Sequence, residues 1–286
     1  MGQRLWYNLF MSQLIGHQGV LDLLVQMHSR GRLSHALLLV GPKSVGKRTL
    51  AELLLSIIYD LPSTSSDFFL IERQLNDKDE LKKNISIDQI RELRHKLQMS
   101  TMGGGWKAAI VDEAETLSIE AANALLKTLE EPTPKTQLVL LTTHLSGVPA
   151  TIASRCQMVE LPLVSHSVMA KNFGEVLAMR AAGRPGLAIR LKTDEEAATR
   201  YEQQAGAWQR LQRVGLAEKM GLVQRSLKQW DARELVDVWE REAHREFLQK
   251  PSSALAQTLR RMAEGRQAIL GNVNVCLAIE HVFIIN

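Results

Sequence analysis

The sequence predicts an α/β domain built on a parallel sheet, followed by a helical second half. Between about residues 12 and 162, short apolar runs alternate with amphipathic segments; the runs at 35–40, 107–111 and 137–142 are predicted strands. After Pro162 the β signal nearly disappears, and segments such as 167–180 and 231–249 have helical spacing. Strands separated by helices are typical of a parallel sheet covered on its faces. Breaks are expected at 182–186, which is glycine-rich, and at the charged stretch 194–200.

The composition indicates a folded protein of more than one domain. Apolar residues make up 45% and charged residues 23% of the 286 residues, the balance of an ordinary globular protein, and single cores stop growing below this size. Lys and Arg number 35 against 31 Asp and Glu, which leaves a net charge of +4. This charge is mild for a protein that holds nucleic acid through many phosphate contacts, so any DNA contact is expected to be shared with partners.

The cysteines and the apolar segments argue against several classes of protein. Cys156 and Cys276 are far apart and lack CxxC spacing, so neither a disulfide framework nor a zinc site is expected. No stretch approaches the roughly 20 apolar residues that span a bilayer. Residues 1–11 mix Arg4, Asn8 and aromatic residues instead of forming the apolar segment of a signal peptide. A cytoplasmic protein is predicted.

A candidate phosphate loop lies at residues 41–47, which read GPKSVGK and satisfy the pattern GxxxxGK. It follows the apolar run HALLLV and precedes the helical run TLAELLLSII. In such a loop, glycines let backbone N–H groups surround phosphate, the helix N-terminus attracts negative charge, and Lys47 reaches the β and γ oxygens. The candidate nucleotide-binding residues are Gly41, Pro42, Lys43, Ser44, Val45, Gly46, Lys47, Arg48 and Thr49.

The loop departs from its pattern at one position. The residue after the lysine is normally Ser or Thr, whose hydroxyl binds Mg²⁺, but here it is Arg48. The next hydroxyl, that of Thr49, lies one residue beyond this position. One helical step turns a side chain by about 100°, so Thr49 is not expected to replace the missing ligand. We therefore expect weak Mg·ATP binding and impaired hydrolysis, unless Arg48 holds phosphate without a metal.

An acidic pair follows the second apolar run. Residues 107–111 lead directly into Asp112 and Glu113; in a Walker B element the first carboxylate holds the metal through water and the second polarises the attacking water. The alternative is an exposed acidic turn that opens the next helix. That helix is predicted at 118–131, with Ser118 as its N-cap and Pro132 just past its end.

Five segments in order carry a more specific signal: LIGHQ at 14–18, GRLSHALLLVGPKSVGK from 31, NISIDQIRELR from 84, AANALLKTLEEP from 121 and SRC at 154–156. Together they resemble the bacterial DNA polymerase III clamp-loader subunits of the AAA+ family, and the wording GRPG near Gly183 is nearest to delta-prime. The closing NVNVCLAIEHVFI extends the resemblance more weakly. It implies an AAA+ phosphate-loop domain at 1–163, a helical lid domain at 164–200 and a helical collar domain for oligomerisation at 201–286.

In that family a five-subunit ring uses ATP to open the sliding clamp and place it on primed DNA. The implied partners are the gamma/tau and delta subunits, with the clamp and primer-template DNA reached through the complex, and no membrane. Arg155 of SRC is similar to the arginine finger offered to a neighbour's ATP, whereas the alternative is that it pairs with a local carboxylate. Thr143, eleven residues before Ser154, resembles the sensor-1 residue, although a purely structural threonine is equally consistent.

Departures from the motor subunits, gamma and tau, favour a delta-prime-like stator. Motors need an intact loop, a four-cysteine zinc module and a sensor-2 arginine. Here Arg48 replaces the hydroxyl residue, no cysteine lies between Tyr59 and Asn84, and Gly186 falls near the sensor position. The resemblance therefore implies ATP or ADP bound weakly at most and no zinc, and residues 60–83 are expected to form a shorter connection.

Three alternatives remain open on the sequence. They are an ATP-hydrolysing gamma/tau-like motor, a scaffold with vestigial ATP motifs, and an unrelated phosphate-loop kinase. Clamp-loader subunits are classed with nucleotidyltransferases through the polymerase holoenzyme, but nothing in this sequence resembles a nucleotidyl-transfer centre. Trp208, Trp230 and Trp239 are candidates for an interface of the collar or for the core of a helical bundle.

Overall fold

The computed structural model describes residues 14–76, 78–79, 81–99, 104–270 and 282. The chain divides into two compact units: the first contains the described residues up to Asn172 together with Gly183–Gly186, and the second contains Phe173–Ala182 and the described residues from Leu187. The domain division at residues 163 and 200 stays a prediction. No helix in the described part of the chain is both long and apolar enough to span a bilayer.

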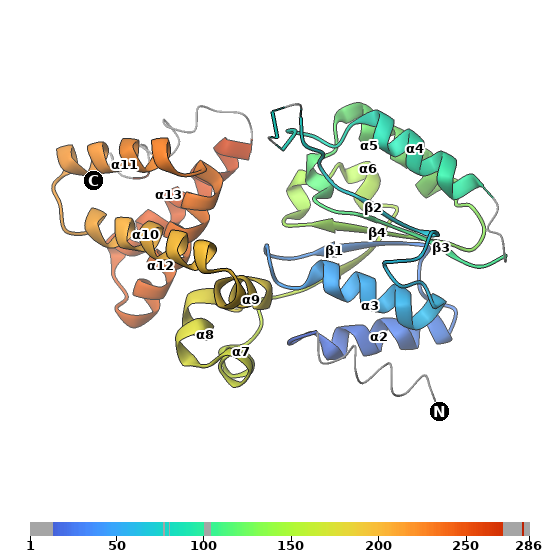
Figure 1. Ribbon diagram of the computed structural model, residues 1–286, viewed down its shortest axis with the longest axis horizontal. Coiled ribbons are helices and arrows are strands. Elements are labelled where there is room, and N and C mark those ends of the chain that lie inside the picture. The colour runs from blue at the N-terminus through green and yellow to red at the C-terminus, as the bar shows by residue number, and fades with distance from the viewer. Residues whose placement is uncertain (1–13, 77, 80, 100–103, 271–281, 283–286) are drawn as a thin grey trace. The chain divides into compact units, whose positions relative to one another are not determined.

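The first unit is a three-layer α/β structure (Figure 1). Its five strands are all parallel and lie in the order β2-β3-β4-β1-β5. Helices α2 and α3 cover one face of the sheet, and α4 and α5 cover the other (Figure 1). The elements are α2 Gln18–Ser29, β1 Ala36–Val40, α3 Lys47–Tyr59, β2 Phe68–Ile71, α4 Ile87–Gln98, β3 Lys107–Val111, η1 Ala114–Thr116, α5 Ile119–Glu130, β4 Thr136–Thr142, η2 Leu145–Gly147, α6 Ala150–Ala153, β5 Gln157–Glu160 and α7 His166–Phe173.

The three central strands are apolar on both faces, which explains why they read as continuous runs. Side chains along a strand point alternately to opposite faces. In β1, Leu37 and Leu39 pack toward α2 and α3, whereas Ala36 and Leu38 pack toward α4 and α5. The three predicted strands are therefore confirmed to within one residue.

Serine caps begin the two helices on the second face. Ser86 and Gln89 form a capping box at the start of α4. Ser118 precedes α5, and its hydroxyl accepts a hydrogen bond from the backbone N–H of Ala121 at 3.1 Å. A helix leaves its first N–H groups without partners inside the helix, so such a side chain stabilises its start. The predicted N-cap is confirmed.

Replacing Ser118 with alanine is expected to lower the free energy of unfolding by about 1 kcal/mol, because the Ala121 N–H loses its acceptor. Urea denaturation followed by circular dichroism measures the change. Ser29→Ala serves as control, since its hydroxyl only donates to the Gln26 carbonyl at an exposed helix end. A loss no larger than that of the control would contradict the capping role.

The second unit is helical in its described part. Its core is formed by Trp208, Leu211, Leu235, Trp239 and Ala243, all fully or almost fully buried. Trp208 and Trp239 are therefore core residues, and Trp230 packs against the same core while partly exposed. The helices are α8 Glu175–Ala181, α9 Pro185–Thr193, α10 Glu195–Leu211, α11 Leu216–Gln229, α12 Ala232–Gln249 and α13 Ser253–Leu270, of which α9 begins in the first unit.

Two expectations need correction. The segment 60–83 is more than a connection, because it contains β2, which pairs with β3. The helical segment at 167–180 is two helices, since Gly174 between α7 and α8 has φ +81°, outside the helical region. The expected break at the charged stretch 194–200 is present at its first residue, since α9 ends at Thr193 and Asp194 caps α10, which contains the rest of the stretch. The closing motif NVNVCLAIEHVFI and Cys276 lie almost entirely outside the described residues.

Candidate functional site

The phosphate loop lies between the end of β1 and the start of α3, as predicted. Gly41 donates its N–H to the Thr142 carbonyl at 3.1 Å, and a Cβ at this position would meet the Leu161 carbonyl oxygen at 2.3 Å. Gly46 has φ +108°, which favours glycine. Two of the loop glycines are therefore required by the backbone itself, and Val45 between them is buried in the core.

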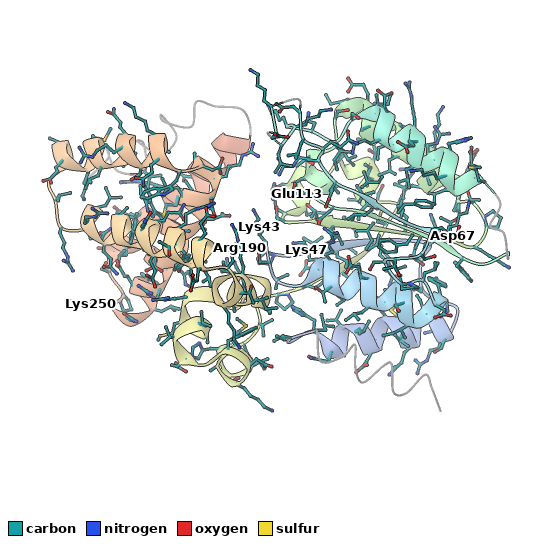
Figure 2. All side chains as sticks on the ribbon, viewed as in Figure 1. Lys43, Lys47, Asp67, Glu113, Arg190 and Lys250 are labelled. Atoms are coloured by element: carbon teal, nitrogen blue, oxygen red, sulfur yellow. The ribbon has the colours of Figure 1, made fainter. Side chains whose placement is uncertain are left out.

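Lys47, the first residue of α3, is buried within this loop. Its ammonium donates to the carbonyl oxygens of Gly41 at 2.6 Å and Pro42 at 2.9 Å. Burial lowers its pKa, and the negative charge of Glu115, then that of Asp112, opposes this effect. Figure 2 shows Lys47 and Glu113 at one end of the sheet, with Asp67 at the opposite end. Lys47 thus lies at the carboxyl edge of the strands, where ligands of α/β folds bind.

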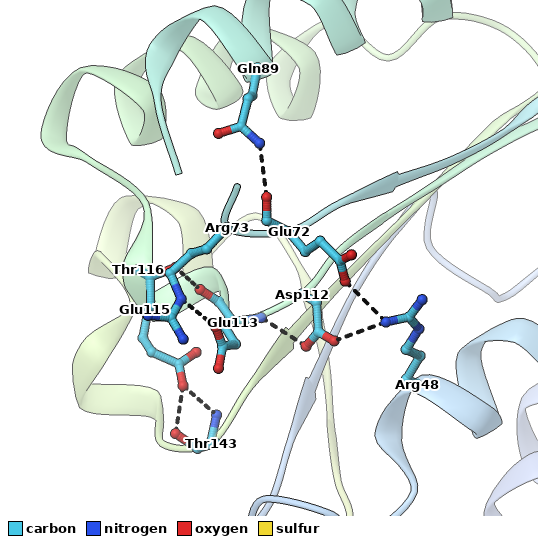
Figure 3. Close-up of polar contacts among 9 residues, drawn as sticks. All are labelled: Arg48, Glu72, Arg73, Gln89, Asp112, Glu113, Glu115, Thr116 and Thr143. Carbon is cyan, nitrogen blue, oxygen red and sulfur yellow. Dashed lines mark hydrogen bonds and ion pairs between the residues drawn. The ribbon is translucent and has the colours of Figure 1, made fainter. Parts of the chain in front are cut away.

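Arg48 points toward the acidic residues that follow β2 and β3 (Figure 3). Its Nε donates to Glu52 at 3.0 Å, its Nη1 donates to Glu72 at 3.1 Å, and Nη1 lies 4.0 Å from Asp112 Oδ2. Burial opposes the charge of the guanidinium, but the hydrogen bond to Glu52 and the neighbouring carboxylates outweigh it and raise the pKa of Arg48. The structure therefore surrounds Arg48 with three carboxylates. Thr49 is half-buried on the same helix.

The two residues of the acidic pair after β3, Asp112 and Glu113, have different surroundings. Asp112 accepts a hydrogen bond from the Glu113 N–H at 2.8 Å, and burial raises the pKa of its carboxyl group. Glu113, at φ +49°, accepts a hydrogen bond from Arg73 Nε at 2.6 Å. The structure brings Asp112 next to Arg48, whereas the carboxylate of Glu113 is already paired with an arginine.

Thr143 is held by a residue that sequence reasoning did not identify. Its hydroxyl donates to Glu115 Oε1 at 2.5 Å, and its N–H donates to the same oxygen at 3.1 Å (Figure 3). The hydroxyl also lies 2.7 Å from His144 Nδ1. The other carboxylate oxygen of Glu115 is buried and has no hydrogen-bond partner among the described residues. The sequence signal that could have identified Glu115 is its place in the acidic run after β3. Glu115 thus connects Thr143 to the charges around Lys47.

Arg155 lies at the end of α6, and its described contacts are with residues outside the phosphate loop. Its Nη2 forms an ion pair with Glu130 at 2.8 Å, and its Nη1 donates to the Thr151 carbonyl at 3.0 Å. Both charged side chains are more than one-third exposed. Next to it, burial raises the pKa of the Cys156 thiol to about 11, so this cysteine is a poorly reactive packing residue. Within this chain Arg155 therefore has the local carboxylate partner considered above.

Gly186, Glu72 and Arg73 complete the surroundings of the loop. Gly186 donates its N–H to the Ser44 carbonyl at 2.9 Å, and a Cβ there would lie 3.1 Å from the same oxygen. Glu72 and Arg73 follow β2, and Gln89 of the α4 capping box donates to the Glu72 carbonyl at 2.8 Å. The sequence signal for Glu72 and Arg73 was the run FFLIER, since it ends in charged residues just as the apolar run 107–111 leads into Asp112 and Glu113.

Comparison with known proteins identifies the family of the chain. The model of the family described as "DNA polymerase III, delta subunit" matches residues 16–165, just over half of the chain. The chain is 31% identical over 187 residues to DNA polymerase III subunit gamma of Buchnera aphidicola, which covers 61% of this chain and 51% of the relative. It is 34% identical over 156 residues to subunit delta' of Pseudomonas aeruginosa, which covers 48% and 46% respectively. The chain thus spans about half the length of these relatives.

A solved structure extends the likeness beyond the first unit. The gamma subunit-related protein of Thermotoga maritima superposes with a TM-score of 0.58 at 20% identity, covering 91% of this chain and 97% of that one. At this identity the superposition establishes the fold alone. Since the family match runs from α2 through the entire sheet and its phosphate loop, the chain belongs to the DNA polymerase III delta-subunit family, and its first unit has the AAA+ phosphate-loop fold.

Proposed function

We propose that this chain is the delta-prime subunit of a bacterial clamp loader, a stator that helps to place the sliding clamp on primed DNA. One observation carries the proposal: the phosphate loop keeps its backbone and Lys47, but Arg48 stands at the metal-binding position against Asp112. A bulky cation at this position disfavours Mg·ATP hydrolysis. A subunit with this loop contributes to the ring as a structural component rather than by hydrolysing ATP itself.

The partners of such a subunit are the gamma/tau and delta subunits, and through them the clamp and primer-template DNA. Arg155 is its arginine finger, offered in trans to ATP bound by the neighbouring subunit. Its own loop binds ATP or ADP weakly. Asp112, Glu113 and Thr143 keep the positions of the hydrolytic machinery, although Glu113 is paired with Arg73 and Thr143 with Glu115.

The alternative function is that of a gamma/tau-like motor. It is favoured by the 31% identity to a relative named subunit gamma and by the retained Lys47, Asp112 and Glu113. Two observations disfavour a motor. Arg48 replaces the hydroxyl residue that binds the metal. Gly186 lies so close to Ser44 that little room is left for the side chain of a sensor arginine at residue 186.

Reconstitution of the loader with and without this chain tests the proposal. We expect that omitting the chain abolishes clamp loading and DNA-stimulated ATP hydrolysis, and that the isolated chain hydrolyses no ATP above the level of a Lys47→Ala control. Hydrolysis by the isolated chain that Lys47→Ala removes would instead establish the motor. A loader that works equally well without the chain would refute both functions.

A further inference from the structure

The environment of Arg48 does not fit the Mg²⁺ that phosphate-loop proteins hold. Such a metal is bound by a hydroxyl directly after the loop lysine and by the carboxylate that ends the Walker B strand. Here the hydroxyl is replaced by a guanidinium whose Nη1 lies 4.0 Å from Asp112 Oδ2. Within the described ranges, no three His, Cys, Asp or Glu side chains are grouped so that they would hold a metal ion. A divalent ion beside Asp112 would meet the positive charge of Arg48.

Two carboxylates orient the guanidinium of Arg48, whose side chain is 45% exposed. Glu52, one turn further along α3, accepts from Nε, and Glu72 at the end of β2 accepts from Nη1. The main chain of Glu72 is itself held by Gln89 at the start of α4. An arginine stays charged at all physiological pH values and its planar fork suits paired oxygen atoms. Arg48 is thus a resident cation, oriented by the same tertiary contacts that place Asp112.

The phosphate loop and the first turn of α3 suit an anion of the polyphosphate type. The loop N–H groups, the first turn of α3 and Lys47 are the standard components of a phosphate site, and Arg48 lies on the same first turn. Arginine recognises phosphate oxygens through two parallel hydrogen bonds. The three carboxylates around Arg48 and its single charge, against the double charge of Mg²⁺, predict a weak site.

We propose that the loop binds a nucleoside di- or triphosphate without a metal ion held by the protein, with Arg48 supplying the positive charge that such a metal ion supplies in other phosphate-loop proteins. This inference rests on the proposed nucleotide binding by the loop. Its consequence is a subunit whose nucleotide occupancy is independent of Mg²⁺. Bound nucleotide would then act as a structural part of the ring and would not be hydrolysed by this chain.

Calorimetric titration of ADP and of ATP into the isolated chain, in Mg²⁺ and in EDTA, tests the inference. For the unmodified chain we expect dissociation constants that agree within about threefold between the two conditions. Arg48→Thr restores the hydroxyl and frees Asp112 and Glu72, so Mg²⁺ should tighten its nucleotide binding by about tenfold or more. Arg91→Thr is the matched control, because Arg91 pairs with Asp88 at an exposed helix surface of the same unit.

A second readout needs no nucleotide. Mg²⁺ alone should raise the unfolding temperature of Arg48→Thr but not that of the unmodified chain or of Arg91→Thr, because only the first variant gains a metal site. If Arg48→Thr does not fold, Arg48→Lys keeps the charge without the fork, and it should bind nucleotide independently of Mg²⁺ but more weakly.

Each other outcome overturns the inference. Binding by the unmodified chain only in Mg²⁺ would overturn it while leaving the proposed nucleotide binding intact. Equal binding by the unmodified chain and Arg48→Thr in EDTA would show that Arg48 does not supply the charge. No binding in either condition would overturn both the inference and the proposed nucleotide binding, and would leave the stator role to the reconstitution experiment.

Discussion

Replacing Arg155 with alanine is expected to reduce the ATP turnover of the reconstituted loader by about 10³-fold, with assembly of the ring unchanged. The expectation depends on the trans role proposed above. A guanidinium aimed at a γ-phosphate stabilises the charge that develops in the transition state, so its loss lowers the rate rather than the affinity for ATP. Turnover stimulated by clamp and DNA, measured beside size-exclusion chromatography of the ring, gives both quantities.

The ion pair between Arg155 and Glu130 does not prevent this role. Both side chains are substantially exposed, at 39% and 49%, and exposed ion pairs contribute only about 0–1 kcal/mol. A buried γ-phosphate in a neighbouring subunit therefore competes easily for the guanidinium. The Thr151 carbonyl, which Nη1 also contacts at 3.0 Å, keeps the side chain near the end of α6.

Glu130→Ala separates the two roles of Arg155. If the arginine acts across an interface, removing its local partner leaves turnover nearly unchanged, and Arg155→Lys restores little because lysine lacks the planar fork. If Arg155 matters only through Glu130, then Glu130→Ala and Arg155→Ala should give the same defect. Unchanged turnover in Arg155→Ala would leave a scaffold as the remaining interpretation.

The largest effect on stability is expected for Trp239→Ala, at about 3–5 kcal/mol. Trp239 is 1% exposed in the core of the second unit, where its ring centroid lies 6.4 Å from that of Trp208. Its indole N–H donates to the Gln204 carbonyl at 3.0 Å. The substitution leaves a large cavity and removes the donor from a buried carbonyl, and both effects destabilise the folded state. Urea denaturation followed by circular dichroism measures the loss.

Trp230→Ala is the matched control for this variant. Trp230 follows α11 and packs against the same core, but it is only partly buried, so we expect a loss of about 1 kcal/mol. The result also tests the contribution of the Trp239 indole to the stability of the core. A variant that keeps its stability but no longer joins the other subunits would show that the indole contributes to assembly rather than to the core.

The parts of the fold that were predicted are those governed by local physics. Strands β1, β3 and β4 are buried on both faces, so each is a continuous apolar run that a sequence reveals directly. Strand β2 lies at an edge of the sheet and its side chains are only half-buried, which leaves a short and ambiguous run. The helical segment at 167–180 was expected without its break, although Gly174 lay within it.

For the candidate site, the sequence by itself determined the phosphate loop, the acidic residues after β3 and the substitution at Arg48, because each depends on neighbouring residues in one segment. Only the tertiary structure decided what these residues contact. Glu72 reaches Arg48, and Arg73 reaches Glu113 across 40 positions, because β2 lies beside β3 in a parallel sheet whose strands end at one edge. Charged side chains take whichever partner the strand order brings within a few ångströms, and that order is a property of the whole sheet rather than of any single segment.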